Sequence, residues 1–319
     1  MWEKDFVECL EKSTAAHPLI DKAFDIKQQH MPKQIYKYFR DCGYTRDNLK
    51  TDTVWLCSPD AYNDPYDCAF TISEDIVVEA AIRTVFEPRV ATYNLQDVIS
   101  AGEIEKAKRN KKPLLAIAEY ISMLIGKMPE RNLKQMDELA SSVLPELINN
   151  IVSFLPRMQT VTKVCSFSAI HDSIIMWSHY ADNHKGFCVE YEIKPLMDGH
   201  ACWQNLYKVI YSSKLYDLTR WAELMIGPDQ DQSNSIYPLL ATIHKFDGWK
   251  YEEEWRLVLL DSKPNDDRNY NVPTPIRVFL GSKMETSSKE ELRAICENTN
   301  IEVWEMHRVS NSFELAAKR

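Results

Sequence analysis

The feature that most constrains the fold is a long block of helical pattern inside a β-rich chain. Apolar residues recur at spacings of three and four across residues 73–157, with prolines as breakers, which predicts about four helices. β-prone segments lie on both sides of this block, at 35–39, 53–57, 161–167, 186–192, 206–211, 252–260, 276–280 and 301–306. We therefore predict an α+β fold with a mixed or split β-sheet assembled from non-contiguous strands and an inserted helical subdomain.

The same pattern divides the 319 residues into three parts. Residues 1–34 form an N-terminal helical segment, with apolar spacing around Phe6, Leu10 and 20–26. Residues 35–72 and 158–319 form the α+β core domain, and residues 73–157 form the inserted helical subdomain. Within the core, further helices are expected at 172–181, in the mixed stretch 215–246, and at 287–298.

Glycine is scarce: the chain has 8, where average usage near 7% would give roughly 22. The glycines stand singly, whereas a dinucleotide-binding fingerprint or a P-loop needs two or three of them clustered. Both nucleotide-binding loops are excluded. Any nucleotide that binds this protein must be held by side chains.

Net charge and cysteine content indicate which binding partners and which cellular compartment to expect. The net charge of −9 disfavours general binding to duplex DNA, which depends on clustered Lys and Arg. We expect no secretory signal and no membrane span, because the N-terminus lacks a cationic and apolar leader and no apolar run approaches 18 residues. The eight cysteines have no C-x-x-C spacing and are typical of reduced thiols, so we expect a cytoplasmic protein.

The first of three polar segments runs from residue 58 to 67, directly after a predicted strand. Its Asn-Asp-Pro turn favours a structural Asx turn, or alternatively a loop that faces a substrate. Two carboxylates alone do not specify a metal. The candidate residues here are Ser58, Asn63, Asp64 and Asp67.

The second segment runs from residue 176 to 188. His179 and His184 are five residues apart, not the four that place two zinc ligands on one helix face, so we expect no metal site. A turn at Gly186 gathers polar groups around one corner, either as satisfied structural groups or as a site. The candidates are His179, Tyr180, His184 and Lys185.

The third segment runs from residue 249 to 260. Period-2 alternation predicts that Glu252, Glu254 and Arg256 share one face of a strand. That face is either an ion-paired surface or the wall of a pocket, where a glutamate takes a proton or stabilises developing positive charge. Trp249 stands at the start of the segment.

The order of these segments resembles the bacterial "domain of unknown function 2971" family. The resemblance rests on Ile35-Tyr-Lys-Tyr-Phe39, Ser58-Pro-x-x-x-Asn-Asp-Pro-x-Asp67, Cys165-Ser-Phe-Ser168, Met176-Trp-x-His-Tyr-Ala-x-x-His-x-Gly-x-Cys188, Val209-Ile-Tyr211, Lys245-x-x-x-Trp249-x-Tyr-Glu-x-Glu-x-Arg256 and Ile276-x-x-x-x-Gly281. It covers residues 35 to 315, approximately. The resemblance implies a role in bacterial phage defence or as a toxin.

The chain also resembles ADP-ribosyltransferases at the level of the fold, and this resemblance implies a reaction. These enzymes bind NAD in a split sheet without a glycine-rich loop and use a late Glu-x-Glu strand. The resemblance implies NAD as the substrate and no metal. Glu254 would stabilise the ribose and Glu252 would activate the acceptor. The residues that would hold the rest of NAD are Tyr36, Tyr38, Ser58, Asn63, His184, Lys185, Trp249 and Tyr251.

Two other functions remain open. One is a hydrolase or nuclease in which His179 and His184 act as acid and base near Asp64 or Asp67. The other is a non-catalytic module that senses a nucleotide-like small molecule. Expected partners are a protein or nucleic-acid acceptor and a partner protein from a defence system. A single site requires that six residues converge on one pocket: Asn63, His179, His184, Glu252, Glu254 and Arg256.

Overall fold

The computed structural model describes residues 2–14, 17–73, 160–193, 201–226, 236–260 and 267–319, together with single positions between 76 and 153. The four-helix insertion predicted for residues 73–157 lies almost entirely outside the described residues. The boundaries predicted for the three parts of the chain therefore stay predictions.

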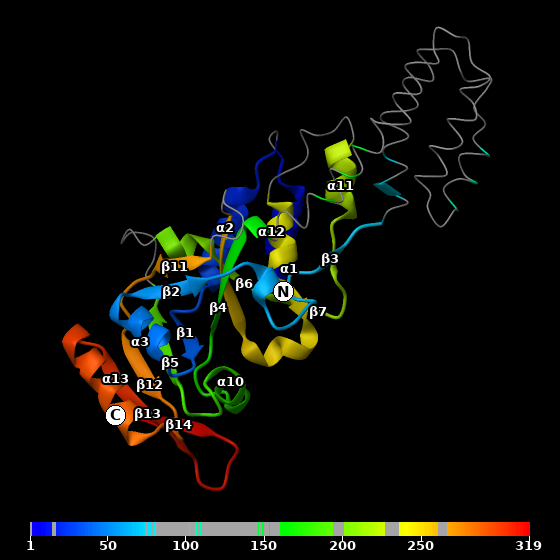
Figure 1. The fold of residues 1–319 in the computed structure, drawn as a ribbon. Coiled ribbons are helices and arrows are strands. Elements are labelled where there is room, and N and C mark those ends of the chain that lie inside the picture. The colour runs from blue at the N-terminus through cyan, green and yellow to red at the C-terminus, as the bar shows by residue number, and fades with distance from the viewer. Residues whose placement is uncertain are drawn as a thin grey trace.

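An eight-stranded mixed sheet dominates the described part of the chain (Figure 1). In spatial order its strands are β14 (Leu315–Lys318), β13 (Glu302–Arg308), β12 (Arg277–Leu280), β5 (Phe187–Glu192), β1 (Gln34–Phe39), β4 (Thr162–Ser168), β10 (Glu254–Leu260) and β6 (Leu206–Lys208). Neighbours pair antiparallel, except β12 and β13, which pair parallel. β1 therefore lies between two strands from after the insertion, which confirms the prediction of a sheet built from non-contiguous strands.

The described residues also form three two-stranded sheets. They pair β2 (Thr53–Leu56) with β11 (Arg268–Asn271), β3 (Phe70–Thr71) with β8 (Tyr216–Asp217), and β7 (Ile210–Ser212) with β9 (His244–Phe246). The single strand predicted at 206–211 was wrong: it is two strands, because Val209 leaves the main sheet after its N–H donates to the Glu254 carbonyl.

The described helices are α1 (Trp2–Lys12), α2 (Ile20–His30), α3 (Gly43–Lys50), α10 (Ile174–Tyr180), α11 (Thr219–Ile226), α12 (Tyr237–Thr242) and α13 (Thr286–Thr299). Short 3-10 helices are η1 (Pro59–Ala61), η5 (Ala201–Asn205) and η7 (Asp247–Glu252). α10 begins at a capped position, because the Ser173 hydroxyl accepts the Met176 N–H. α1 and α2 fall within the predicted N-terminal helical segment.

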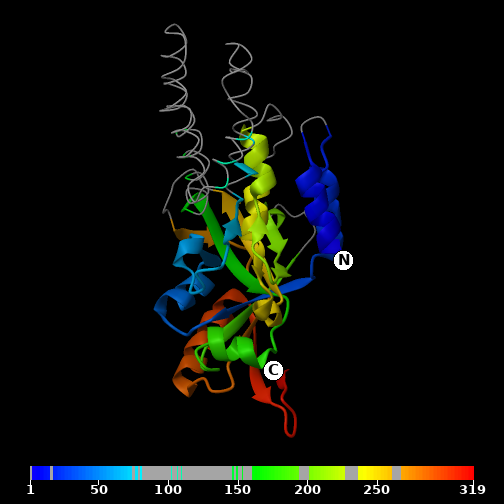
Figure 2. The same cartoon turned by 90° about the vertical axis from the view of Figure 1, so that its right-hand side faces the viewer.

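Both faces of the sheet are buried, and the alternation along β1 shows how. Ile35 and Phe39 belong to the larger core cluster, which includes Leu292 and Cys296 of α13. Tyr38 points to the opposite face and packs with Trp177 of α10. α13 and α10 accordingly lie on opposite faces of the sheet (Figures 1 and 2).

The pairing between β1 and β4 is much shorter than that of the strands on either side of them. β1 pairs with β5 along its whole length, and β4 pairs with β10 along its whole length, but β1 and β4 share the single pair Tyr36 and Ser168. Beyond that pair, the Lys37 Nζ atom donates to the Ser166 carbonyl at 3.0 Å, so a side chain replaces the backbone ladder. The sheet opens here, and the candidate site lies at this opening.

Candidate functional site

A cavity of about 170 Å³ lies where β1 and β4 separate, and we call it the cleft. Its size is close to that of a cavity that holds a benzene ring. Its walls come from β1, β4, α10, the loop after β2, and the β9 to β10 region. The lining residues are Tyr36, Lys37, Tyr38, Tyr62, Asn63, Asp67, Ser166, Phe167, Ser168, Met176, Tyr180, Lys245, Glu252 and Glu254.

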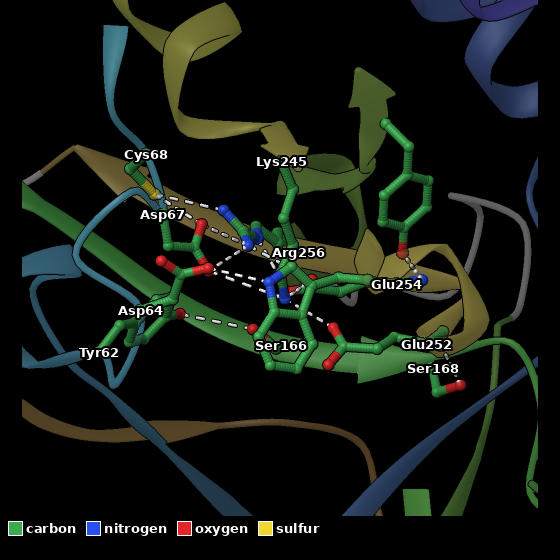
Figure 3. Close-up of polar contacts among 12 residues, drawn as sticks. Tyr62, Asp64, Asp67, Cys68, Ser166, Ser168, Lys245, Glu252, Glu254 and Arg256 are labelled. Carbon is green, nitrogen blue, oxygen red and sulfur yellow. Dashed lines mark hydrogen bonds and ion pairs between the residues drawn. The ribbon is translucent and has the colours of Figure 1, made fainter. Parts of the chain in front are cut away.

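Arg256 anchors the inner side of the cleft and is fully buried. Its Nε donates to Glu254 Oε1 at 2.8 Å, and its Nη2 donates to Asp67 Oδ2 at 2.9 Å and to Glu254 Oε2 at 3.3 Å. Its Nη1 donates to the Thr242 carbonyl at 2.7 Å and to Cys68 Sγ at 3.2 Å. All five guanidinium donors are engaged, so Arg256 is a structural cation that fixes the two carboxylates (Figure 3).

Lys245 links the carboxylates on the open side. Its Nζ atom lies 2.6 Å from Glu252 Oε2, 2.8 Å from Glu254 Oε2 and 3.7 Å from Asp67 Oδ2. Three carboxylates thus surround two cations, Lys245 and Arg256 (Figure 3). With all five groups charged, this cluster carries one net negative charge in a poorly solvated place.

In this cluster the pKa values of the two neighbouring glutamates shift in opposite directions. Burial, which outweighs the Lys245 charge and is reinforced by Glu254, raises the pKa of Glu252 above its usual range. Burial alone would also raise the pKa of Glu254, but the charges of Arg256 and Lys245 together hold that pKa well below its usual range. Glu254 is therefore a permanent anion, and Glu252 is the carboxylate of the pair that exchanges a proton most readily.

The backbone brings these glutamates together in a different way from the predicted one. The predicted alternation from Glu252 was wrong, because β10 begins only at Glu254. Glu252 ends η7, and Glu253 turns the chain with a left-handed φ of 46°. Glu252 is held by the Tyr180 hydroxyl, which donates to its Oε1 at 2.5 Å, while its carbonyl accepts the Ser168 hydroxyl at 2.6 Å.

The loop after β2 contributes both structural and cleft-facing groups. Asp64 Oδ1 accepts the Tyr66 N–H at 2.9 Å, which is the expected Asx turn, and Asp64 Oδ2 accepts the Trp249 indole N–H at 2.8 Å. Asn63 and Asp67 line the cleft. Trp249 lies against the cluster, with its ring 5.3 Å from Lys245 Nζ.

Asp64, Trp249 and Arg256 adjoin the cleft without lining it, and four further candidate residues lie away from it. His179 is exposed and its Nδ1 lies 3.3 Å from the Tyr251 hydroxyl. His184 stacks on Trp177 and its Nε2 bonds the Ser178 hydroxyl, while Lys185 is exposed. Ser58 is buried elsewhere, where it bonds Lys163 and Asp267. The predicted convergence thus holds for Asn63, Glu252, Glu254 and the adjoining Arg256, but does not include the two histidines.

The turn around His184, which we call the corner, comprises residues 181–186 and the Gly281 backbone beneath it. Asp182, Asn183 and His184 all have left-handed φ values, of 47°, 56° and 68°. The His184 and Gly186 carbonyls accept the N–H groups of Lys283 and Gly281, respectively. A Cβ on Gly281 would lie 2.2 Å from the His184 oxygen, so the backbones meet too closely for any side chain.

Sequence reasoning missed several lining residues. Lys245 is the most important, because it contacts three carboxylates; its signal was the first position of the Lys245-x-x-x-Trp249 pattern. Ser166 and Ser168 belong to the Cys165-Ser-Phe-Ser168 pattern and Tyr62 to the first polar segment, but their chemistry alone did not mark them as site residues. Ser166 and Ser168 face Arg256 and Glu254 across the β4–β10 ladder.

The described residues contain neither a cluster of metal ligands nor a membrane-spanning helix. No group of three or more His, Cys, Asp or Glu side chains there is arranged to hold a metal ion. No helix there is both long and apolar enough to cross a bilayer.

Residues 176–257 match a protein family model described as "Protein of unknown function (DUF2971)". These residues form a DUF2971 family domain. The match begins in α10 and ends in β10, so the DUF2971 region includes Tyr180, Lys245, Glu252 and Glu254, whereas β1 and the loop after β2 precede it. Neither the curated proteins nor the solved structures gave a match to this chain.

Proposed function

We propose that the protein is an ADP-ribosyltransferase-like enzyme that cleaves NAD and transfers ADP-ribose, with Glu252 as the reacting carboxylate and a role in bacterial defence or as a toxin. The observation that carries this proposal is the position of Glu252. It lines a cavity the size of one ring at the opening of a sheet, with a raised pKa and with a cation and a hydroxyl holding its two oxygens.

The chemistry needs a poised carboxylate next to a ring-sized cavity. Nicotinamide would enter the cleft, where Tyr36, Tyr38 and Tyr62 supply aromatic walls. The bond between nicotinamide and the ribose then breaks, and its electron pair leaves with nicotinamide. The acceptor nucleophile bonds the same ribose carbon and gives its proton to Glu252. A carboxylate with a raised pKa is suited to this general-base role.

Glu254 receives a different role from the one that the resemblance implied. Its two oxygens already accept hydrogen bonds from Lys245 and Arg256, and its pKa is held low. It therefore acts as a positioning residue: it fixes Lys245, which in turn orients Glu252. The histidine-based hydrolase receives less support, because neither His179 nor His184 lines the cavity that holds Asp67.

Three matched substitutions test this assignment: Glu252→Gln, Glu254→Gln and, as a control, Glu253→Gln. The Glu253 side chain is half exposed and pairs only with Lys208 among the described residues. NAD consumption would be followed by nicotinamide release, and stability by thermal unfolding. We expect Glu252→Gln to lower turnover by about 10²–10⁴-fold with unchanged or higher stability, since it removes a desolvated carboxylate.

The two other variants should behave differently. Glu254→Gln should lower both turnover and stability, the latter by about 2–4 kcal/mol, because it unbalances a buried ion pair. Glu253→Gln should match the parent in both. Equal turnover in the parent and Glu252→Gln would remove the proposed role. NAD binding without turnover in the parent would instead favour the non-catalytic sensing function.

A further inference from the structure

A second cavity, of about 370 Å³, adjoins the cleft, and we call it the outer pocket. The two cavities share Lys245, and the loop after β2 separates them: Asn63 and Asp67 line the cleft, while Asp64 and Tyr66 line the outer pocket. The remaining walls come from the β7 to β8 turn and β9. The full lining is Asp64, Tyr66, Ala69, Ser212, Ser213, Lys214, Leu215, Tyr216, His244, Lys245 and Phe246.

Exposed apolar side chains gather at the outer pocket. Tyr66, Phe246 and Leu215 are 68%, 55% and 43% exposed, respectively, and all three line this one cavity. The Phe246 ring lies against the backbone of Gly248, where a Cβ would come within 2.5 Å of it. Large apolar groups held in the open around one cavity indicate a binding site for a planar, partly apolar ligand.

The polar groups of the outer pocket suit a base with an attached phosphate. His244 Nδ1 lies 2.5 Å from the Leu240 carbonyl, which places the proton on Nδ1 and leaves Nε2 as an acceptor. Its ring stacks on Tyr216 with centres 4.5 Å apart. Lys214 is exposed, and no carboxylate in the described parts of the chain forms an ion pair with it.

We propose that the outer pocket binds the purine nucleoside end of a dinucleotide whose other ring enters the cleft, an inference that rests on the proposed function. The two volumes fit the two unequal ends of NAD: a single ring in the smaller cavity, and a bicyclic base with its ribose in the larger. Tyr66 and Phe246 stack on the base, the amino group of the base donates a hydrogen bond to His244 Nε2, and Lys214 faces a phosphate.

The test measures binding of AMP, nicotinamide mononucleotide and NAD by titration calorimetry. Phe246→Ala and Tyr66→Ala each remove one exposed ring, and Phe313→Ala is the control because Phe313 is 98% exposed on the distant β13 to β14 turn. We expect each pocket variant to weaken AMP and NAD about tenfold, the loss typical of one stacking ring. Nicotinamide mononucleotide should bind equally to the parent and to all three variants.

The outcomes separate this inference from the proposed function. Unchanged AMP and NAD affinity in both pocket variants, or no AMP binding to the parent, would overturn the proposal that the outer pocket binds a purine nucleoside. If turnover depends on Glu252 in that case, the proposed function still stands. Conversely, AMP binding that depends on Phe246 supports the purine site even where Glu252→Gln equals the parent, a result that removes only the catalytic role.

Discussion

The cleft and the corner are both rich in polar motif residues, but different forces build them. In the cleft, Asp67, Glu252 and Glu254 are brought together by two cations, and their carboxylates surround a cavity. In the corner, the close contacts are between backbones, and Gly186 and Gly281 stand where a side chain has no room. The corner's polar side chains do not line the cleft.

This difference shows that a dense motif is not by itself a site. His184 looks like a catalytic group in the sequence, but it occupies a left-handed turn and stacks on Trp177. For Glu252 the sequence left open an ion-paired surface or the wall of a pocket, and the side chain is 3% exposed with a raised pKa. Solvation and ion pairing, rather than residue type, distinguish the two regions.

The largest effect should come from removing the cation behind the cleft. Arg256→Met leaves Asp67 and Glu254 buried without their shared partner, and we expect a loss of about 3–5 kcal/mol in the free energy of unfolding. Urea denaturation measures this loss. The control is Arg220→Met, because Arg220 is 58% exposed and its pairing with Glu223 is a helix surface contact at 3.5 Å.

The control should change stability by no more than about 0.5 kcal/mol. A similar small loss for both arginine variants would mean that the cluster is effectively solvated. In that event the opposite pKa shifts of the two glutamates, and the contrast with the corner, would both lose their physical basis.

The corner should respond to added volume instead of lost charge. A Cβ at position 186 would lie 2.0 Å from the Phe39 carbonyl oxygen, and one at position 281 would lie 2.2 Å from the His184 oxygen. Gly186→Ala and Gly281→Ala should therefore each cost about 1–3 kcal/mol or more of stability, since backbone must move. Gly43→Ala is the control, because nothing lies within 4 Å of its added Cβ.

Gly43 lies in α3, so its substitution should be neutral or stabilise by about 0.5 kcal/mol. NAD affinity of the folded protein should be the same in all three glycine variants. A weaker affinity in Gly281→Ala without a change in stability would contradict the structural role assigned to the corner.

Much of the sheet could be predicted from sequence because its strands are buried and β-prone. The segments around β1, β4, β5, β12 and β13 were each predicted to within a few residues. Their apolar residues pack on both faces, and that burial is what the pattern records. α13 was predicted for the same reason, since Leu292 and Cys296 lie four residues apart on its buried side.

The short strands could not be predicted, because two or three residues carry no periodicity. β3, β8 and β9 exist only through their pairing partners, which lie far away in the chain. β14 was missed for another reason: it pairs with the preceding strand β13, but its sequence Leu-Ala-Ala-Lys has no strong β-preference.

The cleft was predicted in part, for a related reason. Residue chemistry marked Glu252, Glu254, Asp67 and Asn63, and these do lie together. Residue chemistry did not mark Lys245, although it lies close in the chain to Glu252 and Glu254, because its contact with them depends on how η7 and the left-handed Glu253 turn the chain back between β9 and β10. Nor could it exclude Ser58, whose hydroxyl is taken up by the buried Lys163 at 2.6 Å.

The smallest effect concerns Tyr180, which belongs to α10 beside the corner but donates its hydroxyl to Glu252 in the cleft. The folded pKa of Glu252 lies above its ordinary value of 4.5, so its contribution to stability is fully present below pH 4.5 and is lost as pH rises through the folded pKa. The Tyr180 hydroxyl limits this loss, because it binds the ionised carboxylate more strongly than the neutral one.

Tyr180→Phe should therefore cost about 0.5 kcal/mol at pH 4 and about 1.5 kcal/mol at pH 8, measured as the difference in unfolding free energy from the parent. Tyr38→Phe is the matched control, because its buried hydroxyl donates to the neutral Ile170 carbonyl at 3.0 Å, and its cost should not vary over this range. A flat deficit for Tyr180→Phe would show that Glu252 does not change its charge in the folded protein between these two pH values, and the cleft would then be as purely structural as the corner.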